Sequence, residues 1–443
     1  MDDALATIYT AHVTLFKLRY DIALKDSNFD HAAVFSGALH YQFVDDMPYP
    51  FKVNPHFKAW APVTDNPNCF ITYTPGLKPK LIYWQPVDYW HKVAEKPTAK
   101  WVEKFDLVMI SEPDQAKQHI PKGRVAFLGE WDERFASWGD LTPNPEAVVN
   151  SLHFDRAQKT EYEQVCLYRA NERGARGHRA AEKAFRAGAS EYEIHLDYLR
   201  AADTTDDEVP YGNIIALNEN GATLHYYHHG RVRHDEKNRY SFLIDAGAGY
   251  NGYASDITRT WSTKKDEFQE LIDAMDAMQL GLVDMIRPSV NYPDVHLAAH
   301  RGVAEILTRF KFTKDTDAAG LVERRITSTF MPHGVGHLLG LQVHDVGGFM
   351  ADRSGATIPK PEGHPWLRLT RVVEPGWCFT IEPGLYFIDS LLAELKNGEN
   401  AKFVNWDKVD AFRKFGGIRI EDDIIVTETG RENLTRAAFE NVA

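Results

Sequence analysis

The chain has 443 residues, 44% hydrophobic and 26% charged, a composition typical of a globular protein with a sizeable core. This length predicts two or three domains. Lys and Arg number 50 against 63 Asp and Glu, so the net charge of −13 argues against a nucleic-acid partner. No apolar run approaches the roughly 18 residues needed to span a bilayer, so we expect no membrane partner. Three widely spaced cysteines suit buried thiols in a reducing cytoplasm better than a disulfide framework.

The first 155 residues alternate short aliphatic runs with helical stretches. Such runs include AAVFSGAL, CFITYTPG, FDLVMISEP and GRVAFLG. Strand signals separated by helices are typical of α/β domains. We therefore expect an N-terminal α/β domain over residues 1–155, with its boundary in NSLHFDRAQK.

The rest of the chain, residues 156–443, combines helical segments with scattered strand signals. Ser190 and Glu193 form a capping box that predicts the start of a helix. Apolar residues recur with helical period over 264–286, and Pro293 suits the first turn of the next helix. Strand signals cover residues 212–217, 241–261, 376–388 and 417–427. This pattern predicts an α+β domain with a curved sheet and helices on its outer face.

The segment SFLIDAGAGYNGYASDITRTW carries two aspartates on neighbouring predicted strands. Asn251-Gly252 is a strong signal for a two-residue hairpin turn. With that turn, Asp245 opposes Thr258, and Asp256 lies on the same face of the hairpin as Asp245. Two neighbouring carboxylates repel each other, which suggests a cation between them. The alternative is a pair of solvated aspartates.

Two glutamates occupy similar positions in the C-terminal strands. Glu382 follows the apolar strand in WCFTIEPGLYF, and Arg419 and Glu421 share one face of GGIRIEDDIIVTE. Charges on such a face are costly unless they are paired or bound to a metal. A salt bridge from Arg419 to Glu421 or Glu382 is the structural alternative to metal binding.

The segment MPHGVGHLLGLQVHD carries three histidines. His333 and His337 are spaced as in the HExxH helix of zinc proteases, but the glutamate is missing and two glycines disfavour a helix. LGLQVHD predicts a strand that carries His344. Histidines in predicted helices, such as His296 and His300, are expected to be surface or packing residues.

Together the two aspartates, two glutamates and three histidines are hard to explain by packing. Four carboxylates balance the charge of two divalent cations. Hard oxygen ligands favour Mn²⁺, with Co²⁺ or Fe²⁺ as alternatives. Two such metals can share a bridging hydroxide and polarise a substrate oxygen, which suits hydrolysis.

The motifs LIDAGAGYNGYASDITRT, MPHGVGHLLGLQVHD, FTIEPGLYF and GGIRIEDDIIV resemble those of the pita-bread metallopeptidases. VDDMPYPFKVNPHFKAW and PVDYWHKV resemble segments of bacterial prolidases (Xaa-Pro dipeptidases) and of their relatives, the organophosphorus acid anhydrolases. The resemblance implies a creatinase-type N-terminal domain and, over 156–443, a pita-bread domain with a curved antiparallel sheet and outer helices. It further implies a homodimer that hydrolyses Xaa-Pro dipeptides through a hydroxide bridging two Mn²⁺ per subunit.

The resemblance also assigns catalytic and metal-binding roles. The implied metal ligands are Asp245, Asp256, His337, Glu382 and Glu421. Glu382 would in addition shuttle a proton to the leaving nitrogen. His344 would stabilise the tetrahedral intermediate, and His333 would face the substrate beside it.

Further residues would bind the substrate. The resemblance implies that His225 lines the site. It implies that Arg371 and Arg419 hold the substrate's carboxylate. Tyr211 and Tyr292 resemble pocket residues, with core packing as the alternative for each. Asp45 and Trp90 would contact the substrate's amino end from a loop of the partner subunit, with an ordinary surface loop as the alternative.

Three alternative functions stay open at this stage. An aminopeptidase P would remove the residue before proline from longer peptides. Hydrolysis of organophosphate triesters could accompany the peptidase activity, because an activated hydroxide attacks phosphorus as well as carbon. A metal-free peptide-binding protein of the same fold is disfavoured, because all five ligand positions carry suitable residues.

Overall fold

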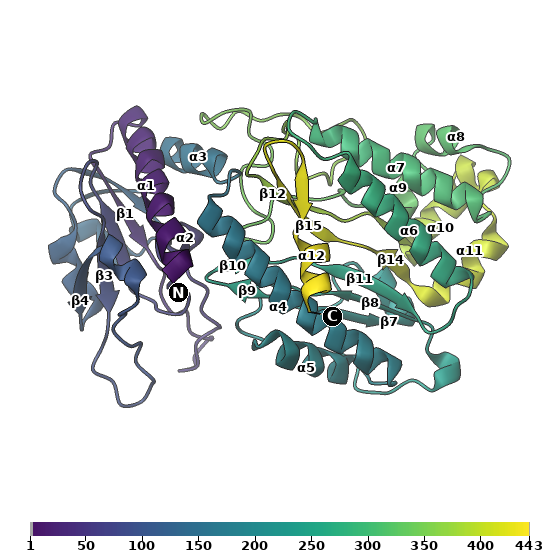
Figure 1. Ribbon diagram of the computed structural model, residues 1–443, viewed down its shortest axis with the longest axis horizontal. Coiled ribbons are helices and arrows are strands. Elements are labelled where there is room, and N and C mark those ends of the chain that lie inside the picture. The colour runs from purple at the N-terminus through teal and green to yellow at the C-terminus, as the bar shows by residue number, and fades with distance from the viewer. Residues whose placement is uncertain (1–2, 443) are drawn as a thin grey trace. The chain divides into compact units, whose positions relative to one another are not determined.

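The computed structural model describes residues 3–442, which form two compact units (Figure 1). Unit 1 comprises Met1–Cys166, Asn251–Tyr253 and Met350–Thr357. Unit 2 comprises Leu167–Tyr250, Ala254–Phe349 and Ile358–Ala443. The division falls inside helix α4 (Glu161–Arg186), C-terminal to the boundary expected from the sequence.

Unit 1 contains a six-stranded mixed sheet with the strand order β4-β3-β2-β1-β5-β6. The strands are β1 (His31–Phe35), β2 (Phe70–Tyr73), β3 (Lys80–Trp84), β4 (Asp106–Ile110), β5 (Arg124–Leu128) and β6 (Asp140–Pro143). The helices are α1 (Asp3–Asp26), α2 (Pro55–Trp60) and α3 (Glu146–Asp155). Phe35, Phe70 and Phe127 meet in one buried aromatic cluster on this sheet. The expected α/β architecture is confirmed.

Unit 2 is built from short antiparallel ladders. β7 (Ile214–Leu217), β8 (Ser241–Asp245) and β11 (Thr258–Ser262) form one, in the order β11-β8-β7. β12 (Cys378–Ile381), β15 (Asp422–Val426) and β16 (Arg431–Asn433) form a second, and β13 (Gly384–Tyr386) pairs with β14 (Gly417–Arg419). A bridge between Thr258 and Glu421 joins the first ladder to the C-terminal strands.

The hairpin register agrees with the sequence prediction. Asp245 pairs with Thr258 across β8 and β11. The two short strands β9 (Gly249–Tyr250) and β10 (Tyr253–Ala254) flank the turn. Asn251 and Gly252 both have positive φ angles, 50° and 89°, as a two-residue type I′ turn requires. The turn therefore fixes which residues face each other, and Asp245 and Asp256 share one face.

The helices of unit 2 pack on its ladders. They are α5 (Glu191–Ala202), α6 (Glu267–Asp284), α7 (Tyr292–Arg309), α8 (Ala318–Glu323), α9 (Thr327–Phe330), α10 (Asp389–Asn397), α11 (Trp406–Phe412) and α12 (Leu434–Asn441), besides α4. The capping box of Ser190 and Glu193 opens α5 as predicted. Phe185 of α4 and Tyr198 of α5 are buried with Phe242 of β8 in one core. Figure 1 shows α6 and α7 side by side, and they contact each other along their length.

One predicted element is wrong. Residues 339–345, LGLQVHD, form bends and irregular backbone in the described structure rather than a strand. The Asp345 amide donates to the Leu338 carbonyl, which closes the segment into a loop. Elsewhere, no helix within residues 3–442 is both long and apolar enough to cross a membrane. Cys69, Cys166 and Cys378 are all buried, as expected.

Candidate metal centre and substrate cavity

Unit 2 contains a cavity of about 640 Å³. Its wall includes all five residues proposed as metal ligands: Asp245, Asp256, His337, Glu382 and Glu421. Three further histidines on the wall are His225, His333 and His344. Residues separated by almost two hundred positions in the chain thus meet in one place.

The two aspartates come from the hairpin. The Tyr211 hydroxyl lies 2.7 Å from Asp245 Oδ1 and 2.6 Å from Asp256 Oδ1, within hydrogen-bond distance of both. Opposite Asp256 stands Gly247, where a Cβ would lie 2.1 Å from the Ser255 carbonyl oxygen and 2.8 Å from the Tyr211 ring. Glycine at this position lets Tyr211 come close enough to contact both carboxylates. Tyr211 therefore lies beside the carboxylates and orients them.

His337 follows a close backbone approach at Gly336. Its Nδ1 lies 3.0 Å from the Leu338 carbonyl oxygen, to which it donates. This hydrogen bond leaves Nε2 facing the carboxylates, 3.3 Å from Asp256 Oδ2 and 3.6 Å from Glu382 Oε1. Metal-binding histidines characteristically use the second ring nitrogen in this way.

The two glutamates complete the ligand set. Glu382 directly follows β12, where Pro383 ends the strand, and Glu421 lies between β14 and β15. The Thr258 hydroxyl donates to Glu421 Oε2 over 2.7 Å, so the bridging strand also orients this carboxylate. Ligand atoms of Asp256, His337 and Glu421 lie within 4.8 Å of one another.

The electrostatics of this group favour bound cations. Burial, reinforced by the neighbouring aspartates, raises the pKa of Glu382 to about 7 even though His337 and Arg419 oppose the shift. Burial and the charge of Asp256 also raise the pKa of Glu421 well above its usual value. Burial disfavours a charged imidazole, yet Asp256 and Glu382 raise the pKa of His337 to about 9. Four carboxylates and one imidazole without a thiolate therefore fit hard divalent cations.

Arg419 contacts one of the ligands directly. Its Nη2 donates to Asp245 Oδ2 over 2.7 Å, and its Nη1 donates to the Tyr386 hydroxyl over 2.8 Å. His333 Nε2 lies 3.0 Å from that same hydroxyl. The alternative considered from the sequence was an ion pair of Arg419 with Glu421 or Glu382, whereas in the structure Arg419 pairs with Asp245. These contacts make Arg419 a residue that orients a ligand on the cavity wall.

Burial keeps the cavity histidines His344 and His333 neutral. Burial, with the charges of His337 and Arg368 adding to it, lowers the pKa of His344 to about 3. Burial and the charge of Arg419 lower the pKa of His333 to about 4. The ring centroid of His344 lies 4.4 Å from that of His337. A neutral imidazole carries one N–H. In His333 it lies on Nδ1 and donates to the Gly334 carbonyl over 2.8 Å, whereas the N–H of His344 can face a substrate oxygen.

The cavity wall brings in an arginine that the sequence analysis did not select. Among the described residues, the cavity wall includes Arg368 and leaves out Arg371. The Arg371 guanidinium lies 4.4 Å from the Trp377 ring centroid and donates to the Gly347 carbonyl. The sequence signal for Arg368 is the pair of aliphatic residues, Leu367 and Leu369, that flank it in LRLTR, and in the structure both are buried while Arg368 is exposed.

Tyr292, Asp45 and Trp90 lie elsewhere. Tyr292 is fully buried, and its hydroxyl donates to the Thr380 carbonyl over 2.9 Å, which agrees with the core alternative. In unit 1, Asp45 is exposed and accepts a hydrogen bond from the Met47 amide. Trp90 is also an exposed residue of unit 1, with 77% of its surface accessible.

Comparison with known proteins identifies the family. Residues 165–428 match the model of metallopeptidase family M24, and residues 7–154 match the Xaa-Pro dipeptidase N-terminal domain. The chain belongs to metallopeptidase family M24. It is 50% identical to the Xaa-Pro dipeptidase of Pseudoalteromonas haloplanktis over 437 residues, which cover 98% of this chain and 99% of the relative.

Further relatives agree. The Xaa-Pro dipeptidase of Shewanella oneidensis is 50% identical over 436 residues, again 98% of this chain and 99% of the relative. The solved structure of Escherichia coli aminopeptidase P with the inhibitor Pro-Leu superposes with a TM-score of 0.69 at 23% identity, covering 96% of this chain and 97% of that one. This likeness shows a shared fold and confirms the pita-bread architecture. As an M24 metallopeptidase, the chain uses divalent metal ions.

Proposed function

We propose that the chain is an Xaa-Pro dipeptidase, which hydrolyses the peptide bond before the proline of a dipeptide. The observation that carries the proposal is the convergence of four carboxylates and His337 on a cavity that also contains His333, His344 and Arg368. The near full-length similarity to Xaa-Pro dipeptidases supports the substrate class.

The metal ligands would be Asp245, Asp256, His337, Glu382 and Glu421. We propose two Mn²⁺ per subunit, with Co²⁺ or Fe²⁺ as alternatives. When bound, such a metal pair activates a water molecule and polarises the scissile carbonyl. Glu382 takes a proton on its carboxylate and passes it to the leaving nitrogen. Arg419 holds Asp245 in place through their 2.7 Å contact.

The rest of the wall positions the dipeptide. Arg368 reaches the substrate's carboxylate through paired N–H donors. This contact limits substrate length, because a longer peptide has no carboxylate at that point. The proline nitrogen of the scissile bond carries no N–H, so the site needs no acceptor for it. His344 donates its N–H to the oxyanion that develops on the attacked carbonyl, while His333 and His225 line the site.

We further propose that the chain works as a homodimer in the cytoplasm. Two loops of unit 1 expose large apolar side chains, among them Phe43, Val44, Tyr89 and Trp90. Exposed apolar groups of this size mark protein contact surfaces. Asp45 and Trp90 of one subunit would contact the amino end of the substrate in its partner. Three buried cysteines agree with a reducing compartment.

The test compares substrate lengths. The Mn²⁺-loaded protein is incubated with Ala-Pro and, separately, with Ala-Pro-Ala, and the released amino acids are quantified. We expect cleavage of the dipeptide alone. Cleavage of only the tripeptide would assign the chain to the aminopeptidase P alternative and overturn the proposal. Asp256→Asn is the control, since it should abolish the activity while the circular dichroism spectrum stays unchanged.

A further inference from the structure

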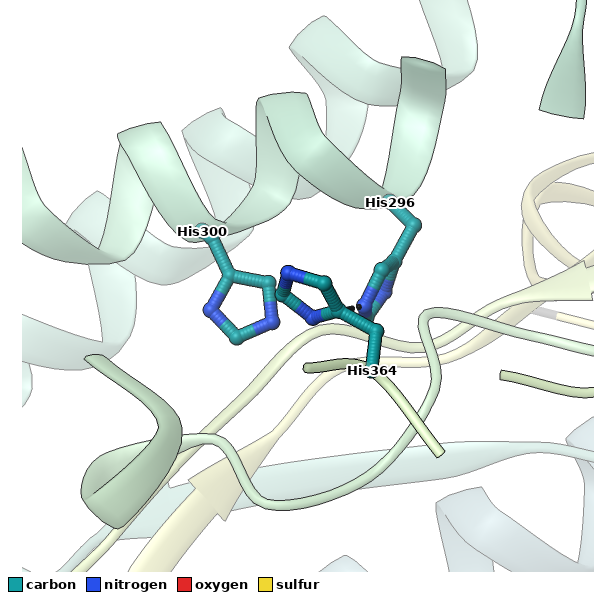
Figure 2. Close-up of side chains that lie close together, drawn as sticks. All are labelled: His296, His300 and His364. Carbon is teal, nitrogen blue, oxygen red and sulfur yellow. Dashed lines mark hydrogen bonds between the residues drawn. The ribbon is translucent and has the colours of Figure 1, made fainter. Parts of the chain in front are cut away.

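A second group of metal-binding side chains lies in unit 2, among residues that do not line the described cavity. His296 and His300 occupy successive turns of α7 (Tyr292–Arg309), and His364 comes from a distant loop. Figure 2 shows the three rings facing one another. The ring centroids of His296 and His300 are 4.7 Å apart, and each lies 4.6 Å from that of His364.

Local structure brings the three rings together. Residues four apart on a helix share one face, so His296 and His300 project side by side from α7. His364 lies in the turn PEGHP, where its amide donates to the Pro361 carbonyl over 3.1 Å. Gly363 in this turn has φ +82°, and a Cβ there would lie 2.4 Å from the Arg325 guanidinium carbon. Glycine is therefore required where the chain turns to present His364 to α7.

The ring nitrogens are arranged as ligands. One nitrogen from each histidine lies within 4.8 Å of the others. His300 Nδ1 lies 2.9 Å from the Thr327 hydroxyl, and a hydrogen bond there leaves Nε2 for another partner. His296 Nε2 lies 2.9 Å from His364 Nδ1. Tetrahedral Zn²⁺ with bonds of about 2.0–2.1 Å places its ligand nitrogens roughly 3.3 Å apart, so small ring rotations suffice.

Hydrogen bonding within the trio leaves one atom unexplained. His296 is only 1% exposed, yet its Nδ1 has no hydrogen-bond partner among the described residues. Buried polar atoms are nearly always paired, so this orphan nitrogen indicates that the trio is not simply a completed hydrogen-bond network. A ring rotation that brings Nδ1 of His296 onto an ion gives this atom a partner.

The charges around the trio select the class of ion. Burial and the neighbouring histidines lower the pKa of His296 to about 2 and that of His300 to about 3, so both rings are neutral and offer lone pairs. The charge of Arg325 acts on His364, and Arg325 pairs with Glu362 at 3.3 Å. Three imidazoles without a carboxylate suit Zn²⁺ and not Mn²⁺, Mg²⁺ or Ca²⁺. His364 is half-buried, so water can supply a fourth ligand.

We propose that His296, His300 and His364 bind one Zn²⁺, separate from the carboxylate centre. The bound ion ties the turn that carries His364 to helix α7. Trp366 and Arg368 follow directly in the chain and line the cavity, so the ion also restrains this part of the cavity wall. The proposal does not depend on which reaction the cavity performs.

The test counts metal. Wild type, His364→Asn and the control His234→Asn, which changes an exposed histidine of unit 2, are saturated with Mn²⁺ and dialysed against micromolar Zn²⁺. Total metal per chain is measured by mass spectrometry, because Zn²⁺ can displace Mn²⁺ from the carboxylates. We expect His364→Asn to hold one ion fewer than wild type and His234→Asn to match wild type. Equal counts in wild type and His364→Asn would overturn the proposal, as would an equal loss in His234→Asn.

Two further measurements separate this site from the carboxylate centre and from a folding defect. In an Asp256→Asn background, the loss caused by His364→Asn should persist unchanged, whatever that background does to the carboxylate-bound metal. In EDTA, wild type and His364→Asn should unfold at the same temperature. Zn²⁺ should then raise Tm more in wild type than in His364→Asn, and should slow amide exchange over residues 361–368 in wild type only. Zn²⁺ protection that is equal in both proteins contradicts the assignment.

Discussion

Replacing Gly336 by alanine should displace the backbone that carries His337 and so weaken metal binding. A Cβ at this position would lie 2.0 Å from the Thr380 carbonyl oxygen and 2.2 Å from the Tyr292 hydroxyl, where real Cβ contacts stay above 3.0 Å. Neither neighbour can move freely, because the Tyr292 hydroxyl donates to that same carbonyl and Thr380 belongs to β12. The chain around His337 must therefore retreat by about 1 Å.

This displacement of the backbone lowers the stability of the fold, and the contacts of His337 indicate by how much. His337 and Thr380 exchange two hydrogen bonds, of 3.0 Å from the Thr380 amide and 3.2 Å to the Thr380 hydroxyl. Overpacking costs about 1–3 kcal/mol, and each lost hydrogen bond about 1 kcal/mol, so Gly336→Ala should destabilise the protein by about 3–5 kcal/mol. A misplacement of about 1 Å at His337 should also lower activity roughly 100-fold.

The assay has a matched control. Gly281→Ala adds the same methyl group on the exposed face of α6, where nothing lies within 4 Å. This variant should gain about 0.5–1 kcal/mol from helix propensity and keep full activity. Urea unfolding, Mn²⁺ titration and kcat/KM for Ala-Pro are measured for both variants. If Gly336→Ala binds Mn²⁺ and turns over Ala-Pro like Gly281→Ala, the close approach does not position His337 and the reasoning is refuted.

Three other outcomes are expected. Chelation of the metals should abolish Ala-Pro hydrolysis, and added Mn²⁺ should restore it, because five ligand side chains then regain their cations. Arg368→Lys should raise KM for Ala-Pro about tenfold with little change in kcat, since a single ammonium replaces paired donors, whereas Arg371→Lys should leave KM unchanged. Burial acts to raise the pKa of Asp422, but its ion pairs with Arg259 and Arg436 lower it to about 2. A depressed carboxyl pKa stabilises the fold above the unfolded pKa of about 3.8, so about 2 kcal/mol of stability should disappear as the pH falls from about 5 to about 1.

Each of these expectations has a contrary result. Full activity after exhaustive chelation would exclude a metal-dependent reaction. A raised KM in Arg371→Lys with none in Arg368→Lys would return the carboxylate-binding role to the residue first inferred from the sequence. Acid unfolding followed by fluorescence should lose this pH-dependent component in Asp422→Asn, and an unchanged pH profile would show that the Asp422 ion pairs do not stabilise the fold.

The features predicted correctly from the sequence are those that local rules determine. Asn251-Gly252 admits few turn geometries, so the turn fixed the register of Asp245 against Thr258 in advance. The motif-based ligand set could be named before its geometry because each residue adjoins a distinctive local pattern.

Sequence reasoning performed less well where distant segments meet. The sequence predicts that His296 and His300 are packing or surface residues. No pattern in α7 indicates that His364, from a distant loop, lies beside them. The sequence offers Arg419 several acidic residues at similar strand positions as ion-pair partners. Only the tertiary structure shows that the partner is Asp245. LGLQVHD has the alternation of a strand, but the amides of Gly340 and Asp345 bond within the loop, to the carbonyls of Gln342 and Leu338. Tertiary context therefore overrides the local strand propensity.

The discontinuity of unit 1 has a consequence for biosynthesis. This unit includes residues 350–357, and within it Arg353 pairs with Asp155 at 2.9 Å while Asn150 donates to the Ser354 carbonyl. A ribosome delivers those late residues only after most of unit 2 has been made. The N-terminal unit therefore cannot mature by itself in the usual vectorial order, and chaperones would meet an incomplete unit 1 for much of translation. Dividing the gene at residue 166 would not yield two self-sufficient halves.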